Sequence, residues 1–214
     1  MPIPFNKNSR FLFIGDAVTD ANRSGDDEGI GTGYVRMIRD YLRAMSTATA
    51  PLVINRGRSG GRLSELLEQC QQEIVAARPD VLSFMIDVPD PHRQPGGSGE
   101  SLGDFRSLYR EVLSRSLTAL PRSKLVLCEP PAVWSLAPVE ADEVLRPYVH
   151  ALFEIAAEFN AQATVPVHSA LVYARKARPD IRWVVEDQLL SSSAHTIIAH
   201  TWLAEVEIIR PSYG

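Results

Sequence analysis

Charged side chains that could take part in chemistry follow the short apolar runs of this chain. Carboxylates that lie close together raise one pKa of the pair, so they can act as an acid/base couple. The candidates, with the arginines and the histidine beside them, are Asp16, Arg58, Asp87, Asp90, His92 and Arg93. Scattered carboxylates suit a hard cation only weakly. The sequence carries no metal or cofactor motif, and we expect neither group.

The elements that must position these residues are short apolar runs alternating with longer amphipathic ones. Continuous, β-favouring runs predict buried strands at 11–14, 52–54, 81–86, 124–128 and 164–167. Apolar residues at helical spacing predict helices at 34–45, 63–77, 104–120, 140–160 and 195–208. This alternation favours a parallel sheet covered by helices on both faces. We therefore predict an α/β protein, a three-layer α/β/α sandwich in one domain over residues 1–214, with ligands at the carboxyl edge of the strands.

Composition and charge exclude several classes of function. The net charge is −4 and the 214 residues contain no dense Lys/Arg run, which argues against nucleic-acid binding. No apolar run reaches the ~20 residues that a membrane span needs, and no signal peptide is evident. Cys70 and Cys128 match no metal or redox spacing and are expected to be reduced, buried thiols. We expect a cytoplasmic protein that contacts neither membrane nor nucleic acid.

Several segments resemble the conserved blocks of the SGNH (GDSL-type) ester hydrolase family. Residues 13–20, FIGDAVTD, resemble the first block, F-I-G-D-S-I-T-D, and residues 55–62, NRGRSGGR, resemble the second, N-x-G-x-S-G-N-x. Residues 87–93 and 187–190 stand where the blocks G-x-N-D-x-W-R and D-x-x-H would fall. Residues 29–34, GIGTGY, look like a segment of acetylxylan-esterase-like members. The resemblance implies a flavodoxin-like, five-stranded parallel sheet of order 2-1-3-4-5.

The same resemblance implies a catalytic site from which key side chains have been lost. The family attacks an ester with a serine, whose proton passes to a histidine oriented by an aspartate, while a glycine N–H and an asparagine amide stabilise the oxyanion. Ala17 stands at the nucleophile, Pro89 at the oxyanion asparagine and Leu190 at the histidine. Gly60 retains the oxyanion glycine and Asp187 the orienting aspartate. A laboratory serine-to-alanine change would explain Ala17 alone, so natural degeneration fits better.

Three readings of the function stay open. The first is a pseudoenzyme that holds a small acyl or sugar-like ligand. The second is an active enzyme whose rebuilt acid/base site uses Asp87, Asp187 and His92. The third is a structural subunit of an oligomer, such as a homo-oligomer.

Substitute catalytic groups are poor candidates. Ser59 and the serines at 191–193 suit turn positions better than nucleophilic ones. His195 aligns with a non-catalytic histidine at a helix entry. Asp87 is expected to pair with Arg58 and to fill part of the former acyl site.

Overall fold

The computed structural model describes residues 2–45, 49–59, 72–88, 101–131, 138–185 and 189–209. Its strands are β1 (Arg10–Gly15), β2 (Leu52–Asn55), β3 (Val81–Met85), β4 (Lys124–Cys128) and β5 (Ala163–Val165). They form one five-stranded sheet of order β2-β1-β3-β4-β5, in which every neighbouring pair is parallel. The predicted α/β class and the strand order implied by the resemblance are confirmed.

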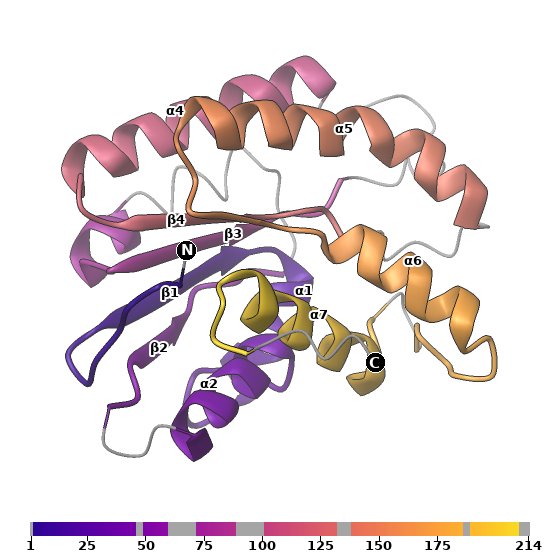
Figure 1. Ribbon diagram of the computed structural model, residues 1–214, viewed down its shortest axis with the longest axis horizontal. Coiled ribbons are helices and arrows are strands. Elements are labelled where there is room, and N and C mark those ends of the chain that lie inside the picture. The colour runs from indigo at the N-terminus through magenta and orange to yellow at the C-terminus, as the bar shows by residue number, and fades with distance from the viewer. Residues whose placement is uncertain are drawn as a thin grey trace.

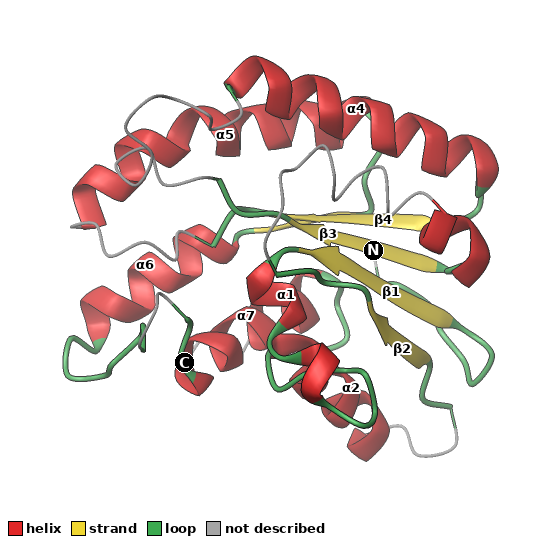
Figure 2. Cartoon of the chain, turned by 180° about the vertical axis from the view of Figure 1, so that it is seen from behind, coloured by secondary structure: helices red, strands yellow, loops and turns green. Residues whose placement is uncertain are grey.

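Helices cover both faces of this sheet (Figures 1 and 2). Two of them, α4 (Leu102–Ala119) and α5 (Pro138–Glu158), lie on one face. The other face carries α2 (Tyr34–Met45), α6 (Val167–Ala177) and α7 (Ser192–Glu205). A four-residue helix, α1 (Ala17–Asp20), and a 3-10 turn (Arg23–Gly25) follow β1, and residues 72–77 are also helical.

The central strands are buried on both faces, which explains why they are predominantly apolar. In β1, Phe11 and Phe13 face the cluster that contains α2 and α7, whereas Leu12 and Ile14 face the cluster beneath α4 and α5. The same alternation continues through β3 and β4 because successive side chains of a strand point to opposite faces. Trp202 of α7 is fully buried, and its indole N–H donates to the Ser83 hydroxyl at 3.0 Å.

Two helices of the structure were not predicted from the sequence. The first is α1, which is shorter than any periodic pattern can reveal. The second is α6, although Val167, Leu171 and Ala174 follow helical spacing and are buried. Pro166 precedes α6 and gives it no side-chain cap, so the usual start signal is missing. The prediction for 63–77 lies outside the described residues except at 72–77.

Other features agree with the expectations. The predicted bounds of α2 and β4 are confirmed, and α5 runs through Pro147 without interruption. Cys128 is a buried free thiol, as predicted, and Cys70 lies outside the described residues. None of the helices in the described ranges is long and apolar enough to cross a membrane.

Candidate functional site

The turn between β1 and α1 is held by the carboxylate of Asp16. Asp16 is the N-cap of α1, where its Oδ1 accepts the Val18 N–H at 3.0 Å. Its Oδ2 accepts the backbone N–H of Asp87 at 2.5 Å, so the carboxyl ends of β1 and β3 are joined. Burial raises the pKa of the Asp16 carboxyl, while these two N–H donors act in the opposite direction. Ala17, at the predicted nucleophile position, is therefore the first residue of α1 and is half-buried.

The loop after β2 is fixed against α1 by Asn55. The Asn55 amide donates to the carbonyl oxygens of Thr19 and Ile30, at 2.7 and 2.8 Å, and its oxygen accepts the Gly57 N–H at 2.8 Å. The contact is so close that a Cβ at Gly57 would lie 2.2 Å from the backbone nitrogen of Asp20. The second block thus needs both its asparagine and its glycine to bring Arg58 and Ser59 to the site edge.

Both side chains that follow Gly57 have partners within the protein. The Ser59 hydroxyl donates to Asp20 Oδ2 at 2.5 Å. Arg58 Nη2 contacts Glu73 Oε1 at 2.5 Å, and the described ion pairs include none between Arg58 and Asp87. The expected Asp87–Arg58 contact stays a prediction, and Glu73 is a partner of Arg58 that was not expected. Glu73 lies on the helical segment 72–77, and its approach to Arg58 could not be read from a separation of 15 residues.

The position predicted for the catalytic base contributes to the core. Leu190 is half-buried and packs against the cluster that includes α2 and α7. Its backbone pairs with Val184 in an isolated antiparallel bridge. Ser191 then caps α7, its hydroxyl accepting the Ala194 N–H at 3.3 Å, so this serine has the turn role expected for it.

His195 takes a structural role near the start of α7. Its Nδ1 accepts the backbone N–H of Tyr34 at 3.2 Å, which satisfies the first orphan N–H of α2. The imidazole stacks on the Tyr34 ring, with centroids 6.4 Å apart and an interplanar angle of 10°. Burial lowers the pKa of His195 to about 4. The interpretation of His195 as a helix-entry residue rather than a base agrees with this geometry.

One carboxylate at this edge was not singled out from the sequence. Glu129 directly follows β4 and is only 2% exposed. Its Oε2 accepts the backbone N–H and the hydroxyl of Ser169 in α6, at 3.1 and 3.2 Å. Burial raises the pKa of Glu129, and the Ser169 donors oppose the rise. Its place after an apolar strand is the signal that also singled out Asp16 and Asp87.

The structure brings Asp16, Ala17 and Asp87 together through the β1–β3 contact and places the loop of Arg58 beside α1. The other predicted site residues lie outside the described residues: Gly60, Pro89, Asp90, His92, Arg93 and Asp187. Among the residues that are described, no group of three or more histidine, cysteine, aspartate or glutamate side chains could hold a metal ion.

Comparisons with known proteins give one partial sequence relative and many structural ones. No protein-family model matches the chain. An acetylxylan esterase of Geobacillus stearothermophilus is 34% identical over 90 residues, which cover 40% of this chain and 41% of that protein. The aligned stretch therefore spans less than half of that relative.

Solved structures match over nearly the whole chain. A protein from Parabacteroides merdae described as a GDSL-like lipase is 25% identical with a TM-score of 0.83, covering 98% of this chain and 100% of that one. The acetylxylan esterase Axe2 of Geobacillus stearothermophilus is 23% identical with a TM-score of 0.81, covering 95% and 96% of the two chains. Block order, sheet order and these similarities agree that the chain belongs to the SGNH (GDSL-type) hydrolase family, in its acetylxylan-esterase-like subgroup.

Proposed function

We propose that the chain is an SGNH hydrolase homologue that does not hydrolyse esters and uses the family fold to bind a small acyl or sugar-like ligand or to assemble with other subunits. Ala17 begins α1 at the nucleophile position, and a methyl group cannot attack a carbonyl carbon. Loss of the nucleophile alone costs about six orders of magnitude in kcat in a well-studied serine hydrolase. The family scaffold is retained around this position, which favours binding or assembly over hydrolysis.

The observation that carries the proposal is the packing of Leu190. Its side chain joins the hydrophobic cluster at the position where the family has its base. His195 offers no replacement, because its Nδ1 already accepts the Tyr34 N–H. A serine restored at position 17 would have neither of these two residues to take its proton.

A structural neighbour supports the idea that the fold tolerates this loss. A catalytic mutant of Axe2 in which a serine is replaced by alanine matches the chain with a TM-score of 0.81, at 25% identity and 96% coverage of each chain. An alanine in place of a catalytic serine is thus compatible with folding. Other structures of Axe2 name it an acetyl-xylooligosaccharide esterase, which makes acetylated oligosaccharides the first ligands to test.

Hydrolysis of 4-nitrophenyl acetate and of acetylated xylo-oligosaccharides at pH 7 tests the proposal. We expect the unmodified chain and Ala17→Ser to match the protein-free blank. The triple variant Ala17→Ser, Pro89→Asn, Leu190→His regains measurable turnover. Ala204→Ser, the same substitution at the far end of α7, controls for the added hydroxyl. A kcat of about 10 per second, typical of enzymes, in the unmodified chain would refute the proposal.

A rebuilt acid/base enzyme is the second candidate, and the burial of the Asp16 carboxyl favours it. Burial raises the pKa of the Asp16 carboxyl, which favours its protonated form relative to an ordinary aspartate. In this reading Asp87, Asp187 and His92 move the proton and no serine acts as nucleophile. If the unmodified chain hydrolyses an ester, Asp87→Asn and His92→Gln should each abolish turnover and change its pH profile. Unaffected rates in both variants would leave this reading without support.

A further inference from the structure

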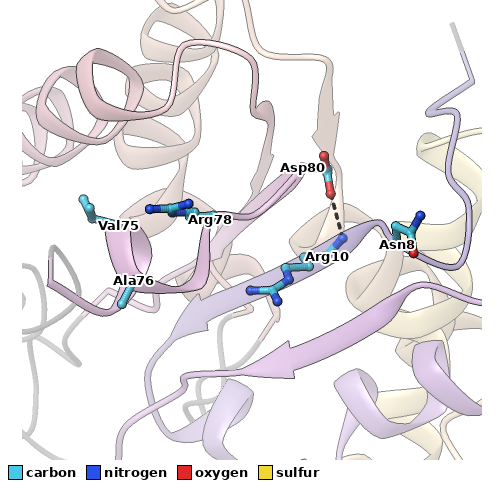
Figure 3. A pocket seen from close by; sticks show the side chains of 6 residues that line it. All are labelled: Asn8, Arg10, Val75, Ala76, Arg78 and Asp80. Carbon is cyan, nitrogen blue, oxygen red and sulfur yellow. Dashed lines mark hydrogen bonds between the residues drawn. The ribbon is translucent and has the colours of Figure 1, made fainter.

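A depression lies at the amino-terminal edge of the sheet, away from the family site (Figure 3). It encloses about 720 Å³ and is lined by Asn8, Arg10, Val75, Ala76, Arg78 and Asp80. Arg10 begins β1 and Gly15 ends it. At ~3.3 Å per residue, the depression and the Ala17 turn are separated by about 17 Å of strand. A ligand here would therefore be independent of the chemistry at the carboxyl edge.

Two guanidinium groups and one carboxylate, that of Asp80, line this depression, so its lining carries one excess positive charge. Arg10 Nη1 donates to the Ala77 carbonyl oxygen at 2.9 Å, and its guanidinium has no other hydrogen-bond partner within the described ranges. The Arg78 guanidinium has no hydrogen-bond or ion-pair partner among the residues that the structure describes. The nearby carboxylate of Asp80 accepts the backbone N–H of Arg10 at 2.8 Å, and no described ion pair joins it to either guanidinium.

The backbone conformation of Arg78 makes a conservative test of its side chain possible. Arg78 has a φ of 47°, in the left-handed region, where the chain leaves the helical segment 72–77 to enter β3. Glycine is the usual residue at such a helix end, because a side chain is disfavoured there. An arginine at this position places a planar, permanently charged donor beside Arg10.

The rest of the lining indicates what the ligand carries besides its charge. Val75 and Ala76 are exposed next to the two arginines and form an apolar wall. Guanidinium groups match the geometry of phosphate oxygens and bind them through paired N–H donors. We propose that this depression binds a small organic phosphate, with the phosphate between Arg10 and Arg78 and the carbon skeleton against Val75 and Ala76.

Titration of ¹⁵N-labelled protein, followed by NMR at constant ionic strength, tests this site. The probes are inorganic phosphate, phenyl phosphate and phenol. We expect saturable shifts of the amides at 8–10 and 75–80 with both phosphates, with phenyl phosphate binding at least ~10-fold more tightly, a difference of about 1.4 kcal/mol. Phenol gives no saturable shift. Equal affinity for the two phosphates would overturn the apolar contact, and absence of saturable shifts with any probe would overturn the site.

Variants separate binding from a purely structural role of the arginines. Arg78→Gly removes the guanidinium and suits the left-handed backbone, so we expect an unchanged or higher Tm together with at least ~10-fold weaker phosphate binding. Arg10→Lys keeps the charge but loses the planar fork, and it should also weaken binding. Arg115→Gln is the control, because Arg115 is paired with Glu111 on α4 and lies outside the depression. Unchanged affinity in Arg78→Gly would refute the proposal, and neither result bears on ester hydrolysis at the other edge.

Discussion

Replacing His195 by phenylalanine tests the structural role of this histidine. The side chain is 8% exposed, and its Nδ1 accepts the Tyr34 N–H at 3.2 Å. Phenylalanine keeps an aromatic ring against Tyr34 but cannot accept that hydrogen bond. A buried donor left without a partner costs about 1–3 kcal/mol. We therefore expect His195→Phe to lower the free energy of unfolding at pH 7 by about 2 kcal/mol.

The pH dependence of the stability difference between wild type and His195→Phe tests the role of His195 more specifically. Burial lowers the pKa of His195 from 6.5 to about 4 in the folded state. Between these values the unfolded chain binds a proton that the folded chain does not, so stability is complete above pH 6.5 and falls as the pH drops toward 4. Each unit of pKa difference corresponds to about 1.4 kcal/mol. The free energy of unfolding of the wild type therefore falls by about 3 kcal/mol through this residue as the pH drops from 6.5 to 4. The stability of His195→Phe does not fall in this way, so the free energies of unfolding of wild type and variant should become equal near pH 5.

Urea denaturation at several pH values between 4.5 and 7.5 measures both effects. His200→Phe is the matched control, because His200 is exposed on the same helix. It should follow the wild-type curve at every pH. A stability difference between wild type and His195→Phe that is independent of pH would refute the reasoning, as would an NMR titration that places the pKa of His195 near 6.5.

Substitutions at three further positions test the contacts that hold the carboxyl edge together, each by urea denaturation at pH 7. Glu129→Gln keeps an acceptor for Ser169 and removes the buried charge, so its free energy of unfolding should stay within about 1 kcal/mol of the wild-type value. Glu129→Ala removes the acceptor and should lower the free energy of unfolding by about 2 kcal/mol. Gly57→Ala forces a Cβ to within 2.2 Å of the Asp20 nitrogen and should cost about 3 kcal/mol. Asn55→Asp cannot donate to two carbonyl oxygens and should cost about 3 kcal/mol, while a loss below about 0.5 kcal/mol would contradict its bridging role.

Much of the fold could be predicted because its central strands are buried on both faces. Runs such as 11–14 and 125–128 have no charged residue on either side of the pleat, and this pattern is typical of parallel strands between two helical layers. Strand order could not be derived from periodicity and came from the family resemblance. The helix α6 was missed because its start lacks a side-chain cap and the predicted fifth strand already reached Val167.

The candidate site could be predicted where its residues belong to recognisable blocks. Asp16 and Asp87, which belong to two different blocks, are joined by a hydrogen bond from the Asp87 N–H to the Asp16 carboxylate. The partner of Arg58 could not be predicted, because side-chain pairing depends on where the helical segment 72–77 places Glu73. Glu129 belongs to none of the quoted blocks, so only its position after a strand could have identified it.

The central claim is that no activated nucleophile stands at the carboxyl edge of the sheet. Intact mass spectrometry after incubation with a fluorophosphonate, which forms a covalent adduct with activated serines, tests it directly. We expect the unmodified chain to keep its mass, because position 17 is alanine and the Ser59 hydroxyl is bound to Asp20. A stoichiometric adduct mapped to Ser59 or to a serine at 191–193 would contradict it.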